Sequence, residues 1–316
     1  MNKAGFINYM ESNDLSPMTI NKHLRYTEQF FKKMKKEDIQ VTKPDVLRFL
    51  EYLKNSRKLQ NRHRSEFLVS LNHYFTFLYK GGMITENPCW FLKIHGTNKK
   101  KLHRIYTPEE LDQLFDNYYA LFVLNYDDSG KQWREHSRIQ SKLVKARNAL
   151  FLSIFINQGA TTNEIRKIEL DDIDFIKAKI KLRGGTRLND RNLPLKASQI
   201  GLLMNYLQNI RPQLMEYQTT ENNKLILSLP PTIETETDKN ILQYAFNILS
   251  KHLKGIDRQF INFVQIRTSV ITNWIKTEGL RKAQYMAGHR CISSTEKYLP
   301  NNLDELIDDI NKLHPF

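Results

Sequence analysis

The sequence has 316 residues and a net charge of +14, from 48 lysines and arginines against 34 acidic residues. Its two cysteines exclude a disulfide framework and a cysteine-based zinc cluster, and no apolar run approaches the roughly 18 residues that a membrane-spanning helix needs. The first residues also lack the apolar segment of a signal peptide. We therefore expect a cytoplasmic protein of about two domains, without a membrane partner.

The positive charge lies mainly in the first third of the chain. Residues 1–105 carry +11, and residues 106–316 carry only +3. A folded segment this basic indicates a polyanionic partner, most often nucleic acid. The alternatives are a basic surface without a partner, and an anionic membrane, which the absence of a basic, tryptophan-rich amphipathic helix disfavours.

Three helices are predicted within residues 1–94. The first begins at Ser16 and Pro17, and it has one apolar face: Ile20, Leu24, Thr27, Phe31 and Met34. The second begins at Thr42-Lys-Pro-Asp, and the third covers residues 67–80 and ends at two glycines. These segments predict an all-helical domain with lysines and arginines on its polar faces.

Residues 95–106 are predicted to connect this domain to a second one. Four basic residues lie between Lys99 and Arg104, so the segment is either a solvated linker or a strap along a phosphate backbone. The second domain, residues 107–316, begins at a capping box in which Thr107 precedes Pro108 and Glu110 lies three residues after the threonine.

The second domain is predicted to be mainly helical with one small antiparallel sheet. Residues 178–183 and 191–195 flank the turn-rich stretch GGTRLND and indicate a β-hairpin. Helices are expected at residues 146–158, 198–210, 240–253 and 260–276.

Three residues near the C-terminus have the properties that phosphodiester cleavage requires. Arg267 interrupts an apolar helix, where it needs an anion, and Tyr298 lies nine residues after the Gly288-His289 pair. Arg267 could clamp a phosphate, His289 could donate to it, and Tyr298 could attack it to form a 3′-phosphotyrosyl link. The alternatives are a packing tyrosine, a buried ion pair at the arginine and a turn-capping histidine. The scattered histidines predict no metal site, and the chemistry needs no cofactor.

This order of residues resembles the C-terminal box of the tyrosine recombinases, the lambda-integrase and Xer-like family. The stretch INQGATTNEIRKIELDDIDF is similar to the family's pattern Gly-Leu-Arg-x-x-Glu-Leu followed by Asp-Ile, and RNLPL is similar to the end of its basic hairpin. The resemblance implies an N-terminal helical, SAM-like DNA-clamp domain and a catalytic domain. It also implies duplex DNA as partner, a homotetramer on DNA, and no small-molecule ligand.

The chain departs from the family pattern at three of the six expected catalytic positions. The first arginine falls on Thr161, the hairpin lysine falls near Gly185 and Thr186, and a histidine falls on Val264. Arg187 is the best candidate to replace the lysine as proton donor or phosphate clamp.

Two other arginines lie near the altered positions in the sequence. Arg183 is the second candidate for the hairpin cation. Arg166 is about 140° around a helix from Thr161 and is expected to point elsewhere.

Two functions follow from these residues. The first is a site-specific recombinase or integrase of a mobile element, and the second is a catalytically impaired homologue that binds DNA as an accessory protein. The last 16 residues have an apolar stripe: Leu303, Leu306, Ile307, Ile310 and Leu313. Such a helix could pack on its own domain or on a neighbouring protomer, and the sequence leaves both open.

Overall fold

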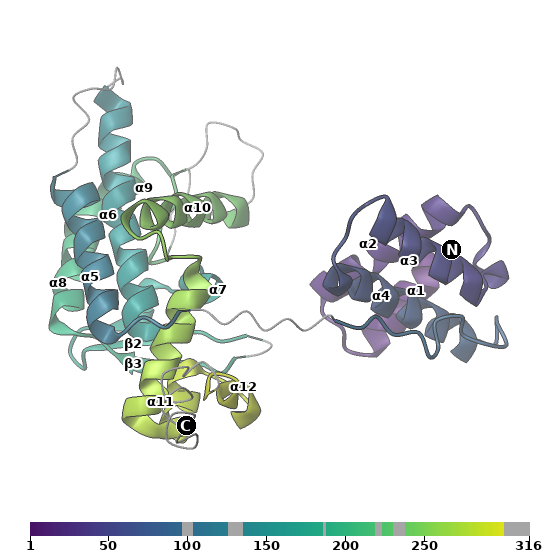
Figure 1. Ribbon diagram of the computed structural model, residues 1–316. Helices are drawn as coiled ribbons and strands as arrows, with labels where there is room; N and C mark the ends of the chain where they lie inside the picture. The colour runs from purple at the N-terminus through teal and green to yellow at the C-terminus, as the bar shows by residue number, and fades with distance from the viewer. Residues whose placement is uncertain (97–103, 126–134, 186–187, 219–222, 230–237, 300–316) are drawn as a thin grey trace. The chain divides into compact units, whose positions relative to one another are not determined.

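A computed structural model describes residues 1–96, 104–125, 135–185, 188–218, 223–229 and 238–299. The chain divides into two compact units, Met1–Lys101 and Leu102–Phe316, which are described separately (Figure 1). The predicted class is confirmed: the described residues are mostly helical, with one small antiparallel sheet. None of the described helices is long and apolar enough to cross a membrane.

Within residues 1–96, the first unit forms four α-helices and a short 3-10 turn. They are α1 (Lys3–Ser12), α2 (Pro17–Met34), η1 (Asp38–Gln40), α3 (Lys43–Asn55) and α4 (Asn61–Lys80). The predicted start signals are present, since the Ser16 hydroxyl accepts from the backbone N–H of Thr19 and Thr42 forms a capping box with Asp45. Helix α1 precedes the first predicted helix and was not expected.

Aromatic side chains fill the core of the first unit. The fully buried ones include Phe6, Phe30, Phe49, Tyr74 and Phe75. The predicted apolar face of α2 is correct at Ile20, Leu24 and Thr27, but Phe30 rather than Phe31 is fully buried. Consecutive residues of an α-helix point about 100° apart, so Phe31 lies at the edge of the buried face, where it packs against the core.

The second unit contains the remaining elements. Its helices are α5 (Pro108–Tyr119), α6 (Glu135–Gln158), α7 (Thr162–Ile165), α8 (Ala197–Asn205), α9 (Arg211–Met215), α10 (Asp238–Ile256), α11 (Phe263–Ala287) and α12 (Ile292–Glu296). Short helical turns lie at η2 (Ala120–Leu124), η3 (Leu170–Asp172) and η4 (Tyr206–Ile210). The predicted capping box is present at the start of α5, where Thr107 and Glu110 bond reciprocally.

The sheet of the second unit has three antiparallel strands in the order β1 (Ile173–Asp174), β2 (Lys179–Leu182) and β3 (Arg191–Pro194). Ile180 pairs with Leu193, and Leu182 pairs with Arg191, which gives the predicted hairpin. All four side chains are buried, so an arginine occupies a core-facing position of β3. Strand β3 contacts α11 (Figure 1).

Helix α11 extends further than predicted. The sequence predicted a helix that ends at residue 276, followed by a short basic segment, whereas the helical structure continues to Ala287. Gly279 interrupts it with φ 79° and ψ 164°, a conformation that only glycine adopts readily. Gly288, with φ 73°, then ends the helix immediately before His289.

Residues 104–106 are bound to α11 through main-chain atoms. The N–H of Tyr106 donates to the Ser269 hydroxyl over 2.9 Å, and the Asn273 amide donates to the Tyr106 carbonyl over 2.9 Å. Gln265 donates to the Arg104 carbonyl over 3.2 Å. The entry of the chain into this unit is therefore fixed on three successive turns of α11.

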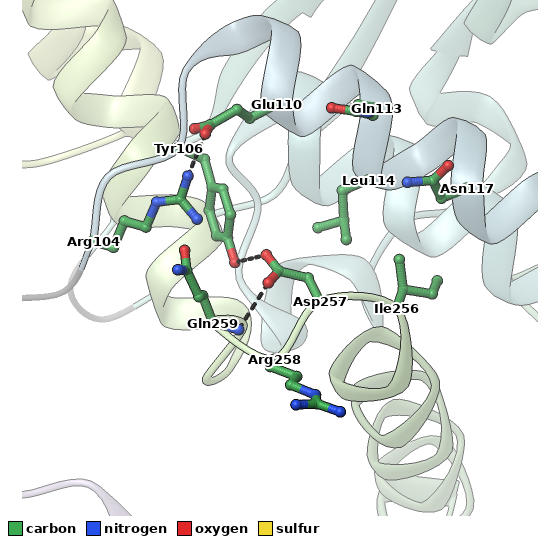
Figure 2. A pocket seen from close by; sticks show the side chains of 10 residues that line it. All are labelled: Arg104, Tyr106, Glu110, Gln113, Leu114, Asn117, Ile256, Asp257, Arg258 and Gln259. Atoms are coloured by element: carbon green, nitrogen blue, oxygen red, sulfur yellow. Dashed lines mark hydrogen bonds and ion pairs between the residues drawn. The ribbon is translucent and has the colours of Figure 1, made fainter.

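A pocket of about 470 Å³ lies beside this segment (Figure 2). In it the Tyr106 hydroxyl donates to Asp257 over 2.6 Å, and Arg104 pairs with Glu110. None of the three residues singled out near the C-terminus lines this pocket.

Candidate active site

Arg267 is held rigidly in the interior of the second unit. Its side chain projects from the first half of α11, and the residue is 8% exposed. One guanidinium nitrogen donates to the Gly159 carbonyl at the end of α6, and Nη2 donates to the Ala287 carbonyl over 2.8 Å. Burial lowers the pKa of Arg267, while the carboxylate of Glu164, 3.7 Å from Nη1, opposes this shift. The guanidinium therefore stays charged and has a fixed orientation.

His289 directly follows the glycine that ends α11, and it contacts Arg267. Its Nδ1 lies 2.9 Å from the Thr295 hydroxyl, and its Nε2 lies 3.4 Å from Nη2 of Arg267. Because a guanidinium only donates, Nε2 is the acceptor, and the proton of the neutral ring is assigned to Nδ1. Burial and the charges of Arg267 and Arg191 lower the pKa of His289 to about 4. The imidazole is therefore neutral at pH 7.

Tyr298 completes the group just after α12. Its ring is nearly parallel to the imidazole of His289, with ring centres 5.7 Å apart and an interplanar angle of 17°. Its backbone N–H donates to the Thr295 carbonyl over 3.0 Å, and its side chain is half-buried. Thr295 thus fixes both the histidine, through its hydroxyl, and the tyrosine, through its carbonyl.

Gly288 is required by the space around it as well as by its positive φ. A Cβ atom at this position would lie 2.6 Å from Nη1 of Arg191 and 3.0 Å from the Asn189 carbonyl oxygen. The backbone of the Gly-His pair can therefore approach the arginine only because residue 288 has no side chain.

A buried ion pair lies next to these residues. Nη1 of Arg191 bonds to one carboxylate oxygen of Glu164, and the other oxygen accepts from the N–H and the hydroxyl of Thr161, over 2.8 and 2.9 Å. Burial raises the pKa of Glu164, but the hydrogen bond and charge of Arg191 outweigh this and hold it below its usual range. Glu164 is therefore ionised, between Arg191 and Arg267.

The second unit matches a known protein family. A family model described as "Phage integrase family" matches residues 134–305, more than half of the chain. The chain belongs to the phage integrase family. The predicted resemblance to the tyrosine recombinases, and with it the predicted enzyme class, is thereby confirmed.

Relatives of this phage integrase family member align along most of its length. The tyrosine recombinase XerC of Oceanobacillus iheyensis is 26% identical over 98% of this chain and 94% of its own. XerC of Listeria innocua is 24% identical over 87% and 83%.

Solved structures share the fold of this chain. XerH site-specific recombinase bound to a palindromic difH substrate matches with a TM-score of 0.64, at 18% identity over 93% of this chain and 79% of that one. A lambda integrase dimer bound to a core site matches with a TM-score of 0.62, at 10% identity over 93% and 92%.

Two of the positions that depart from the family pattern lie within the described residues. Thr161 is the N-cap of α7, and its hydroxyl is engaged with Glu164, so it provides no charge. Val264 lies in the first turn of α11, one turn before Arg267, and is 62% exposed. The cation and the imidazole of the family pattern are therefore replaced by a capping hydroxyl and an exposed aliphatic side chain.

The hairpin loop packs against the Gly288-His289 turn. Leu188 and His289 form a β-bridge, and the N–H of Asn189 donates to the Gly288 carbonyl over 2.8 Å. Arg290 donates to the Gly185 carbonyl over 3.1 Å. Thr186 and Arg187, between these contacts, are outside the described residues, so the role of Arg187 stays a prediction.

The other two arginines considered from the sequence are engaged elsewhere. Arg183 pairs with Asp172 and Glu169, at 2.9 and 2.6 Å. Arg166 donates to the side-chain oxygens of Asn163 and Gln243.

Glu164 and Arg191 were not predicted to belong to the site. The spacing of Thr161 and Glu164 is that of a capping box, and this pattern predicts the hydrogen bond between them. The alternation of Arg191 with Leu193 and Leu195 in RNLPL could have placed the arginine on the buried face of the strand. Among the described residues, no group of three histidine, cysteine or acidic side chains could hold a metal ion.

Proposed function

We propose that the chain is a site-specific recombinase that cuts and rejoins duplex DNA through Tyr298, in the service of a mobile element. One observation carries the proposal: a fixed guanidinium, a neutral imidazole and a half-buried tyrosine, distant in sequence, converge in one place. Arg267 contacts His289, and His289 stacks on Tyr298. The full-length similarity to tyrosine recombinases supports the same reaction.

In the proposed step the Tyr298 oxygen attacks a backbone phosphorus. The new bond is a 3′-phosphotyrosyl ester, and the bond that breaks is between phosphorus and the 5′ oxygen. The Tyr298 hydroxyl gives up its proton as it attacks, and the leaving 5′ oxygen takes up a proton, so the exchange leaves the number of protons unchanged. Attack by the freed 5′ hydroxyl reverses the step and rejoins strands without a nucleotide or a metal. Because the phosphodiester is exchanged for another ester, no external energy source is needed.

Arg267 and His289 act on the phosphate during this exchange. Arg267 stabilises the charge on the non-bridging oxygens, where a fixed donor accelerates such reactions by about 10²–10³-fold. A bound phosphate also competes with Nε2 of His289 for the protons on Nη2 of Arg267, and its negative charge raises the pKa of the imidazole. Nε2 can then carry a proton and donate it to the same oxygen.

Arg187 is proposed to act beside the leaving 5′ oxygen, as proton donor or phosphate clamp. Its neighbours support this role, because Leu188 pairs with His289 and Gly185 accepts from Arg290. The loop that contains Arg187 is thus attached on both sides to the turn around His289.

The remaining parts of the chain are proposed to bind DNA and other protomers. Residues 1–94 and the strap at 95–106 carry most of the excess positive charge and would clamp the duplex, while residues 107–316 form the catalytic domain. The apolar stripe after Tyr298, which lies outside the described residues, would dock on a neighbouring protomer in a tetramer.

The test uses nicked duplexes of random sequence. Cleavage next to the nick releases a short strand, which diffuses away and leaves the protein covalently attached. We expect SDS-resistant adducts with the unmodified chain and none with Tyr298→Phe. Tyr285→Phe is the matched control, because Tyr285 is an exposed tyrosine of α11, and it should react normally. An undiminished adduct with Tyr298→Phe would rule out the proposal.

The substitutions at Thr161 and Val264 motivate the alternative, an accessory DNA-binding homologue. In that case the chain binds duplex DNA with an affinity that falls steeply with salt, and no duplex yields an adduct. A large gain of cleavage in Thr161→Arg would then identify the missing arginine as the cause.

A further inference from the structure

Arg191 is a buried cation that the proposed reaction does not yet use. Its side chain is fully buried, although it belongs to the first residue of a β-strand. Nε donates to the Met286 carbonyl over 2.7 Å, and Nη1 bonds to Glu164. Nη2 is buried and has no hydrogen-bond partner within the described residues.

Glu164 has two cations within reach. Arg191 bonds directly to one carboxylate oxygen, whereas Nη1 of Arg267 lies 3.7 Å from the other. A buried carboxylate attracts the nearest cation strongly, because little water screens the interaction. With Arg191 present, Glu164 is already paired and Arg267 stays at the longer distance, bonded to main-chain carbonyls.

The net charge beside the phosphate depends on Arg191. Arg267, Arg191 and ionised Glu164 together carry one positive charge, while without Arg191 the sum is zero. Thr161, where the family pattern has an arginine, adds none. The site therefore contains two guanidinium groups, those of Arg267 and Arg191. Arg191 lies on a strand about 30 positions after Thr161, where the family pattern has its first arginine.

We propose that Arg191 is a positioning residue that neutralises Glu164 and so keeps Arg267 available for the phosphate. This inference rests on the proposed function. Arg191 does not touch the DNA, since its side chain is fully buried. It acts through Glu164, and its loss converts Arg267 from a phosphate clamp into the partner of a buried carboxylate.

The test measures single-turnover adduct formation on a reactive nicked duplex, together with DNA affinity. Arg191→Met should slow adduct formation about 100-fold, the effect of losing one charge-stabilising donor, while DNA affinity changes less than about threefold. The double variant Glu164→Gln, Arg191→Met removes both charges and leaves Arg267 free again. Its rate should return to within about tenfold of the unmodified chain.

Arg147→Met is the matched control. Arg147 is also a buried arginine, and it donates to the Leu227 carbonyl and to Asn148. Its loss should lower stability without changing the rate of adduct formation by the folded fraction. This separates loss of any buried guanidinium from loss of the charge beside Arg267.

Each outcome decides the inference. An unchanged rate in Arg191→Met, or a double variant that remains about 100-fold slow, overturns the role of Arg191 while the adduct of the unmodified chain still supports the proposed function. If Arg191→Met does not fold, the double variant, which has no unpaired charge, gives the decision. Absence of any adduct from the unmodified chain removes the proposed function and this role together.

Discussion

The two sides of the candidate active site differ in how they depart from the family pattern. The side formed by α11 and α12 keeps its arginine, histidine and tyrosine, and the three contact one another. The side formed by α7 and the hairpin has a threonine in place of an arginine, and two of its charged residues, Glu164 and Arg191, are buried. In the proposed arrangement, positive charge is supplied to one site from different chain segments, directly by Arg267 and through the neutralised carboxylate of Glu164 by Arg191.

The largest effect is expected from removing Arg267, the cation on the side of the site that matches the family pattern. Arg267→Met should slow adduct formation on a nicked duplex about 10³-fold, or ~4 kcal/mol, because no other described guanidinium contacts His289. Single-turnover kinetics measures this, and Arg258→Met, an exposed arginine, is the control. A rate near that of the unmodified chain would mean that the other side holds the phosphate, which would reverse the comparison.

The next-largest effect is expected at Gly288, where the backbone of one side approaches Arg191 of the other. Gly288→Ala should destabilise the second unit by about 3 kcal/mol, because the new Cβ both strains the backbone and meets the Arg191 guanidinium. Urea unfolding measures the loss. Gly82→Ala is the control, since Gly82 also has positive φ but nothing lies within 4 Å of its Cβ position, so only about 1 kcal/mol should be lost. Equal losses of stability in the two variants would show that the contact between the new Cβ and Arg191 does not contribute to the destabilisation.

The smallest effect is a dependence of stability on pH that burial and the cations of both sides impose on His289. Its pKa is about 4 in the folded chain and 6.5 is the ordinary value, so the unfolded chain takes up the proton first as pH falls. The stability is fully present above pH 6.5 and is lost as pH falls towards 4. Between pH 7.5 and 5 the loss should be about 2 kcal/mol.

His289→Gln isolates this contribution. Urea unfolding at the two pH values should show a smaller loss for the variant than for the unmodified chain, by about 2 kcal/mol. His23 in the first unit provides a comparison, because its pKa is also lowered to about 4, chiefly by burial and by His73. If the variant and the unmodified chain lose equal stability, His289 is not neutralised by its surroundings.

The helices were predictable because their signals are local. Ser16, Thr42 and Thr107 mark helix starts through side chains that bond within three residues, and a hairpin is marked by its turn residues. The extension of α11 past Gly279 was missed, because glycine usually ends a helix and here it joins two. The burial of Phe30 was missed, because it lies about 100° around α2 from Phe31, on a side that Phe49 and Phe75 cover.

The site was predictable only along one segment. Arg267, His289 and Tyr298 follow one another in a recognisable order, so the sequence alone singled them out. The pairing of Glu164 with Arg191 joins residues 27 positions apart, and that of Arg267 with Gly159 joins residues 108 apart. Such contacts depend on how β3 and α6 pack against α11, which no local pattern encodes.

The attachment of residues 104–106 to α11 has a mechanical consequence. The bonds reach main-chain atoms of Arg104 and Tyr106 from Gln265, Ser269 and Asn273, on the helix that also carries Arg267. A pull on the chain at residue 104 would therefore load the backbone of α11 directly, and it would not be absorbed by a slack loop. Within the second unit, a force applied at residue 104 would therefore act on the same helix that orients the Arg267 guanidinium.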